Sequence, residues 1–115
     1  MSRWKDIYLH LKNDGFDVYS PGQHEGECLS PYVVVKDAGT TRFGGFSSHK
    51  ALYEVLCYVP KDTFSQLEPF VQKVKTSMKK MYPMIRSADY ETASFYDDTV
   101  KGHMVSVQYI NYRKI

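Results

Sequence analysis

The potential transition-metal ligands of this sequence include His24, Cys28, His49, Cys57 and His103. Only His24 and Cys28 lie close together, four positions apart, and no second close pair accompanies them. A structural zinc site normally shows two pairs of ligands at short spacings. We therefore expect polar loop histidines and a buried thiol here, with no metal and no cofactor.

Motifs for other kinds of catalysis are also missing from the sequence. Asp97 and Asp98 are adjacent, so on an extended chain their carboxylates point in opposite directions, and aspartates are favoured in turns. Gly44-Gly45 lacks the lysine-serine signature of a phosphate-binding loop. No serine lies in a nucleophile elbow, and no cysteine has a motif that would lower its pKa. The sequence therefore predicts a protein that is not an enzyme.

The charge distribution argues against nucleic acid as a direct partner. The formal net charge is only +2, and the basic residues are scattered. Their densest cluster, at positions 73, 75, 79 and 80, falls on the polar side of a predicted helix, where a solvated surface is the simpler interpretation.

The elements that must position these residues are clearest between 51 and 81. Residues 51–60 form a predicted strand that ends at Pro60, and a helix follows, starting near Ser65. Two capping boxes could open it, Thr63 with Gln66 or Ser65 with Glu68, and Pro69 is tolerated only in its first turn. Its apolar residues repeat at a 3-4 spacing and share one face: Phe64, Leu67, Val71, Val74, Met78 and Met81.

The remaining segments complete an α+β pattern. An N-terminal helix is predicted from the stripe Trp4, Ile7, Tyr8 and Leu11, with Ser2 as a cap and Gly15 as its stop. Strands are predicted at 16–19, at 32–36, from 84 towards 95, and at 103–112. We predict one domain over 1–115 in the order α-β-β-β-α-β-β, with a mainly antiparallel β-sheet and two helices.

Residues 37–49 allow two interpretations. The segment is rich in glycine and serine and carries Arg42, Phe43 and Phe46. A long loop inside a small domain is often functional, so these side chains could face a partner. Alternatively, the segment is the extended tip of a hairpin whose phenylalanine rings fold back on the sheet.

The strand at 51–59 has two semi-apolar faces. Tyr53, Val55, Cys57 and Val59 share one face, and Leu52, Glu54, Leu56 and Tyr58 share the other. Glu54 is the only charged residue among them. Helices can cover one face, so we expect the second face, with Leu52, Glu54, Leu56 and Tyr58, to contact a neighbouring subunit.

Cysteine usage and hydropathy indicate a cytoplasmic site of synthesis. Cys57 alternates with valines and is expected in the core, and we expect both thiols to be free. The chain opens on a charged amphipathic segment rather than a signal peptide. No apolar run approaches the roughly 20 residues that span a bilayer, so no membrane partner is expected.

Three stretches of this sequence resemble small proteins encoded in the tail-assembly regions of phages and prophages of Gram-positive bacteria. The first runs from Pro21-Gly22-Gln23-His24 through Gly26, Cys28 and Ser30-Pro31-Tyr32-Val33-Val34-Val35-Lys36. The others are Tyr53-Glu54-Val55 with Tyr58-Val59-Pro60, and Asp97-Asp98 with Lys101, Ser106 and Tyr109. The expected order of elements also resembles that of tail-terminator proteins of long-tailed phages.

The resemblance implies a structural role in the virion tail, assembled in the bacterial host cytoplasm. Tail terminators form a hexameric ring that caps the tail tube and offers the surface where the head joins. The implied partners are further copies of this chain, the tail tube protein and head-tail connector proteins. A neck or head-completion protein is the alternative, and a small nucleic-acid-binding regulatory module is a third.

Overall fold

The structure, a computed structural model, describes residues 3–24, 26–42 and 48–114. Its elements in chain order are α1 (Trp4–Asn13), β1 (Val18–Tyr19), β2 (Tyr32–Arg42), β3 (Ser48–Pro60), the 3-10 turn η1 (Phe64–Gln66), α2 (Leu67–Lys79), β4 (Arg86–Glu91), β5 (Phe95–Asp97) and β6 (Gly102–Lys114).

The strands form one six-stranded sheet in the order β1-β2-β3-β6-β4, and β5 also pairs with β6. β1 runs parallel to β2, whereas the other pairings are antiparallel. The expected α+β class is therefore confirmed. The predicted order of elements is wrong in one detail, because three strands follow α2. The strand predicted from 84 towards 95 is divided into β4 and β5, because residues 92–94 belong to neither. Within β4 the register shifts between Ser87 and Glu91, where Asp89 has a left-handed φ of 57°.

The hairpin formed by β2 and β3 extends into residues 37–49, which agrees with the second interpretation of that segment as far as the described residues reach. Residues 37–42 lie in β2, and the two strands stay paired out to Arg42 and His49. The strand predicted at 32–36 does not end there, because Asp37 to Gly39 form a bulge and regular pairing continues at Thr40. Gly39 takes a φ of 100° there, and its N–H donates to the Asp37 carboxylate at 2.9 Å. A glycine in this conformation lets the strand bend and continue.

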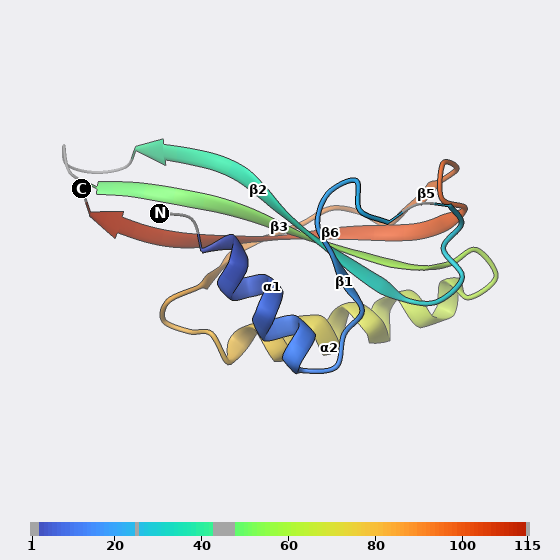
Figure 1. Ribbon diagram of the computed structural model, residues 1–115. Coiled ribbons are helices and arrows are strands. Elements are labelled where there is room, and N and C mark those ends of the chain that lie inside the picture. The colour runs from blue at the N-terminus through green and yellow to red at the C-terminus, as the bar shows by residue number, and fades with distance from the viewer. Residues whose placement is uncertain (1–2, 25, 43–47, 115) are drawn as a thin grey trace.

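Both helices lie on the same face of the sheet (Figure 1). The helical stripe predicted for 64–81 is confirmed at five of its six positions: Leu67, Val71, Val74, Met78 and Met81 are buried. Phe64 is 55% exposed because it lies in the 3-10 turn that precedes α2. Neither predicted capping box forms; the Thr63 hydroxyl donates to the carbonyl of Pro60 at 2.9 Å instead.

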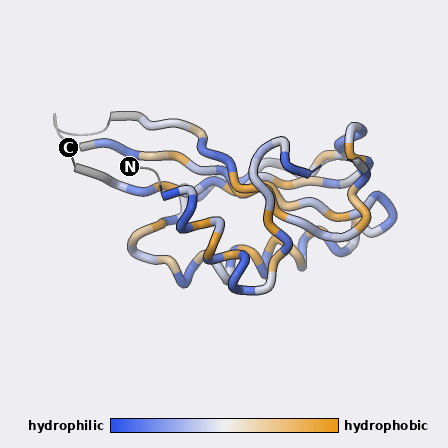
Figure 2. Tube along the Cα trace, in the orientation of Figure 1, coloured by the Kyte–Doolittle hydropathy of each residue, from blue (hydrophilic) through white to orange (hydrophobic). Residues whose placement is uncertain are grey.

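The core lies between the helices and the middle of the sheet, where hydrophobic residues gather (Figure 2). Ile7 and Leu11 of α1 are fully buried, as is Cys57 of β3. Cys28 and Cys57 are both free and both buried. Within the described residues, no helix is both long and apolar enough to cross a membrane.

A polar cluster joins the end of α1 to α2. The Asp14 carboxylate accepts hydrogen bonds from the Ser77 hydroxyl and, at 3.0 Å, from the Lys80 ammonium. His10 Nε2 lies 2.8 Å from the carbonyl oxygen of Ser77. The pKa of Asp14 lies below its usual 3.8, mainly because of the hydrogen bond from Ser77 and next because of the hydrogen bond from Lys80.

This cluster predicts an acid dependence of stability. The pKa of Asp14 is lower in the folded state than in the unfolded state, so the ionised carboxylate stabilises the fold. This stabilisation is fully present above the unfolded pKa and is lost as the pH falls through the folded pKa. Asp14→Asn should therefore lower stability at neutral pH and flatten its decline below about pH 4. Urea unfolding at several pH values measures both effects. An unchanged pH profile in Asp14→Asn would contradict the assignment.

Candidate assembly surface

The strand β3 presents the four predicted contact residues on the sheet face that has no helix. Leu52, Glu54, Leu56 and Tyr58 are all half-buried. Their neighbours in sequence are buried on the opposite side, in the core formed with the helices: Ala51, Tyr53, Val55, Cys57 and Val59. We call the helix-free side, defined by Val34, Leu52, Glu54, Leu56, Tyr58 and Gln108, the open face.

The neighbouring strands extend this open face. Leu56 lies opposite Val34 of β2, and Leu52 lies opposite Ile110 of β6. Glu54 lies between Lys36 of β2 and Gln108 of β6. Opposite charges across a strand pair are favourable, so the single acid of this face has a cation as its neighbour. The middle of the open face is thus apolar, with a short polar row across it.

One end of the open face is occupied by a stack of aromatic rings. Tyr58 and Tyr32 stack with centroids 4.7 Å apart, and His24 stacks on Tyr32 at 4.0 Å. Tyr19 meets the edges of this stack, 5.5 Å from Tyr32. Each such pair contributes about 0.5–1.5 kcal/mol beyond burial. Burial also raises the pKa of both Tyr32 and Tyr58, so both phenols stay neutral.

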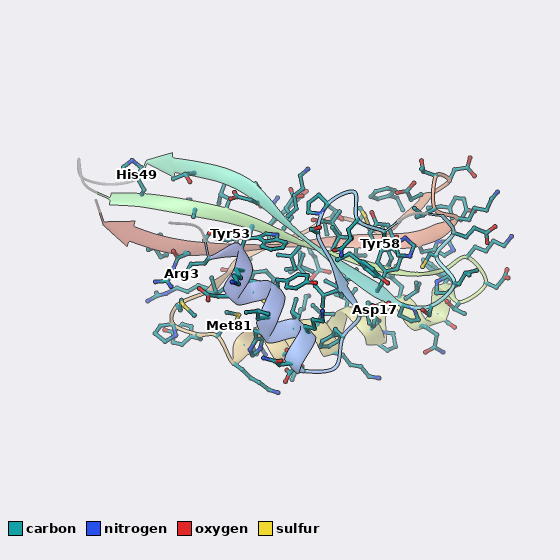
Figure 3. The ribbon with its side chains drawn as sticks, viewed as in Figure 1. Arg3, Asp17, His49, Tyr53, Tyr58 and Met81 are labelled. Atoms are coloured by element: carbon teal, nitrogen blue, oxygen red, sulfur yellow. The ribbon has the colours of Figure 1, made fainter. Side chains whose placement is uncertain are left out.

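The chain between β1 and β2 covers this aromatic end. His24 lies on the Tyr32 ring, and the Cys28 N–H donates to the carbonyl of Val100 at 2.7 Å. Tyr58, labelled in Figure 3, therefore already packs within its own subunit. Leu52, Glu54 and Leu56 are the part of the predicted set that lies away from this cover.

At the other end of the sheet, β2, β3 and β6 extend beyond the helices as a three-stranded blade (Figure 1). The molecule is accordingly elongated, with extents of 48 × 25 × 24 Å. Arg42 ends β2 here and pairs with His49. The Arg42 side chain, Phe43 and Phe46 lie outside the described part of the chain, so their predicted contact role stays a prediction.

The two thiols and His103 fill structural roles. Burial raises the pKa of Cys28 to about 11 and that of Cys57 to about 12, which keeps both thiols protonated and weakly nucleophilic. The ring of His103 lies against Phe64 and Tyr96, and its Nε2 is 3.1 Å from the Lys61 carbonyl oxygen. Over residues 3–24, 26–42 and 48–114, no three His, Cys, Asp or Glu side chains form a group that could hold a metal.

Sequence reasoning missed the ring stack and the His103 cluster. His24 and Tyr32 are separated by an irregular polar segment, so neither helical nor strand periodicity connects them. The only available signal was the high number of tyrosines, ten in this chain, which favours amphipathic surfaces without placing them.

No protein-family model matches this chain, and no curated protein matches its sequence significantly.

Proposed function

We propose that this chain is a structural phage or prophage protein that caps the tail tube as a ring and helps to join the tail to the head. The observation that carries the proposal is the open face of β3. It presents Leu52 and Leu56 beside Val34, on the side of the sheet that has no helix. The resemblance of residues 21–36 and 53–60 to tail-assembly proteins supplies the context.

A ring requires that each subunit presents two different surfaces, because identical contacts repeated by rotation are heterologous. The elongated shape and the blade supply surfaces at a distance from each other. In this proposal the open face packs against the next subunit of a hexamer. The blade, in which β2 ends at Arg42, approaches the tube protein or the connector proteins.

The energetics fit an interface that forms late in assembly. Full burial of one leucine stabilises by about 1.5–3 kcal/mol, so a few half-buried apolar residues bind weakly as isolated pairs. Subunits that are held together on the tube end meet at a high effective concentration, so each weak contact of a six-membered ring forms more readily there than in solution. We therefore expect the isolated chain to be largely monomeric and the ring to close on the tube.

Deletion of the gene in a phage that carries it tests the proposed role. Without a cap, tube growth has no stop, so the expected result is tails of uncontrolled length in electron micrographs. Normal free tails beside full heads would instead indicate a neck or head-completion role. Restoration by the gene supplied in trans is the control for effects on neighbouring genes.

A further inference from the structure

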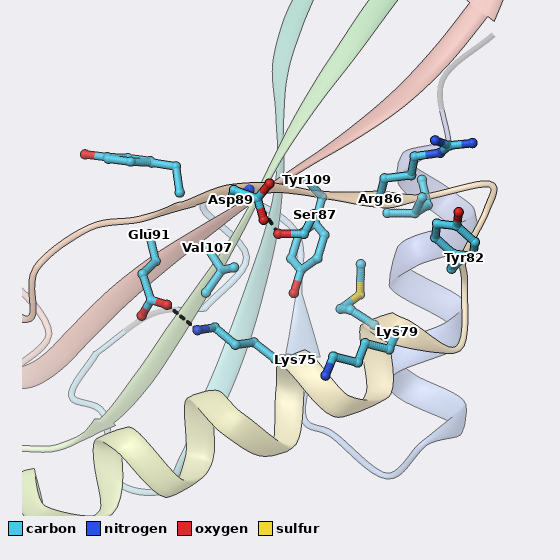
Figure 4. Close-up of a pocket in the computed structure, with 12 residues that line it drawn as sticks. Lys75, Lys79, Tyr82, Arg86, Ser87, Asp89, Glu91, Val107 and Tyr109 are labelled. Atoms are coloured by element: carbon cyan, nitrogen blue, oxygen red, sulfur yellow. Dashed lines mark hydrogen bonds and ion pairs between the residues drawn. The ribbon is translucent and has the colours of Figure 1, made fainter.

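A cavity of about 620 Å³ lies between α2 and the sheet edge formed by β4 (Figure 4). It is on the helix side of the sheet, away from the open face. Its apolar wall consists of Met78 from α2, Val107 from β6, and Ile85, which directly precedes β4. Each of these side chains is at least nine-tenths buried. This volume falls in the range of small-molecule sites, which combine apolar walls with a few polar groups.

The cavity exists because β4 departs from β6. Ser87 pairs with Tyr109 and Glu91 with Val107, and the register shifts between these two pairs. Asp89 occupies the left-handed region there, with its N–H held by the Ser87 hydroxyl at 3.0 Å. That conformation costs a non-glycine residue about 1–2 kcal/mol, and such strain is concentrated at functional sites.

The Tyr109 hydroxyl is the polar group aimed into this space. The side chain is only 5% exposed, and its hydroxyl points towards α2 between Lys75 and Lys79 (Figure 4). No side chain or backbone group of the described residues makes a hydrogen bond with it. Burial raises the pKa of Tyr109 above its usual 10, so the group remains a donor. Because Tyr109 lines the cavity, water or a bound ligand can supply the partner of this hydroxyl.

The cations around the cavity favour an anionic ligand. Lys75 is paired with Glu91, whereas Lys79 is exposed at the rim and has no ion pair with the residues described. Arg86 lies over the rings of Tyr82 and Tyr112, at 5.2 Å and 5.7 Å. The carboxylates of Asp89 and Glu91 also line the cavity, and Glu91 is paired with Lys75, so the three cations Lys75, Lys79 and Arg86 exceed the two carboxylates by one positive charge.

We propose that this cavity binds a small molecule with one carboxylate on a short apolar body. The Tyr109 hydroxyl donates to one carboxylate oxygen, and the Lys79 ammonium neutralises its charge. The apolar body contacts Met78, Ile85 and Val107. This binding site is independent of the ring proposed above, because it uses none of the residues of the open face.

Titration of the whole protein with octanoate, followed by amide and methyl NMR shifts, tests the proposal. We expect saturable shifts centred on Ile85, Val107 and Met78. Tyr109→Phe removes only the hydroxyl and should weaken octanoate binding about tenfold, because a hydrogen bond to a charged group is lost. Lys79 is exposed, so Lys79→Gln should not affect folding. We expect this variant to bind octanoate more weakly, with an affinity that depends less on salt concentration.

Octan-1-ol is the matched probe, because it keeps the apolar body without the charge. We expect it to bind more weakly than octanoate and to be insensitive to Lys79→Gln. The proposal is overturned if octanoate gives no saturable shifts, or if its shifts centre elsewhere on the protein. Equal octanoate affinities of the wild type and Lys79→Gln, or of octanoate and octanol, would also overturn it.

Discussion

Replacing both Leu52 and Leu56 with aspartate is expected to abolish binding of the protein to the ends of uncapped tail tubes while the subunit stays folded. Both side chains are half-buried on the open face, so aspartate there remains hydrated in the free subunit. In the proposed ring the same carboxylates would be buried without partners, which is strongly unfavourable. Losing two half-buried apolar contacts alone weakens association about 10- to 100-fold.

Cosedimentation of the variant with uncapped tubes measures this effect, and circular dichroism reports the fold. Leu9→Asp is the matched control, because Leu9 is an exposed leucine of α1, on the helix side of the sheet. We expect Leu9→Asp to cosediment like the wild type. If the Leu52/Leu56 double variant also cosediments normally, the open face is not the contact surface.

Substitution of Tyr53 is expected to have the largest effect on stability. This residue of β3 is 1% exposed and packs in the core with Ile7 and Leu11. Its hydroxyl accepts a hydrogen bond from the backbone N–H of Arg3 at 2.8 Å, next to the start of α1 (Figure 3). Tyr53→Ala removes both interactions and leaves a cavity, at a cost of about 3–5 kcal/mol.

A loss of that size is a large part of the 5–15 kcal/mol by which a domain of this kind is stable. Tyr53→Phe keeps the ring and should cost only about 1 kcal/mol, the net value of a hydrogen bond. Urea unfolding of the three proteins gives both numbers. Similar losses in the two variants would mean that the hydroxyl, rather than ring packing, dominates at this position.

Prediction from the sequence succeeded where one face of an element is buried. The helix stripe that includes Val71, Val74 and Met78 and the alternation along β3 both arise from burial on one side, so their periods are visible locally. The open face followed from the same alternation, with Leu52 and Leu56 on the side without helices.

Prediction failed where one residue type serves two backbone geometries. Asp37 and Gly39 are typical of turns, but here they form a bulge inside a strand, because pairing with β3 continues on both sides of them. The strand predicted from 84 towards 95 bulges at Asp89 and ends at Glu91, although residues 89–95 contain no glycine or proline. The cavity lies beside this bulge, so no periodicity of the sequence indicated it.

The most direct measurement of the central claim is the tail-length distribution of a deletion phage supplied with each form of the gene. The wild type and Leu9→Asp should restore tails of uniform length. The Leu52/Leu56 double aspartate variant, expressed at the same level, should leave tails of uncontrolled length. Uniform tails with the double variant would contradict the account, because the ring would then close without the open face of β3.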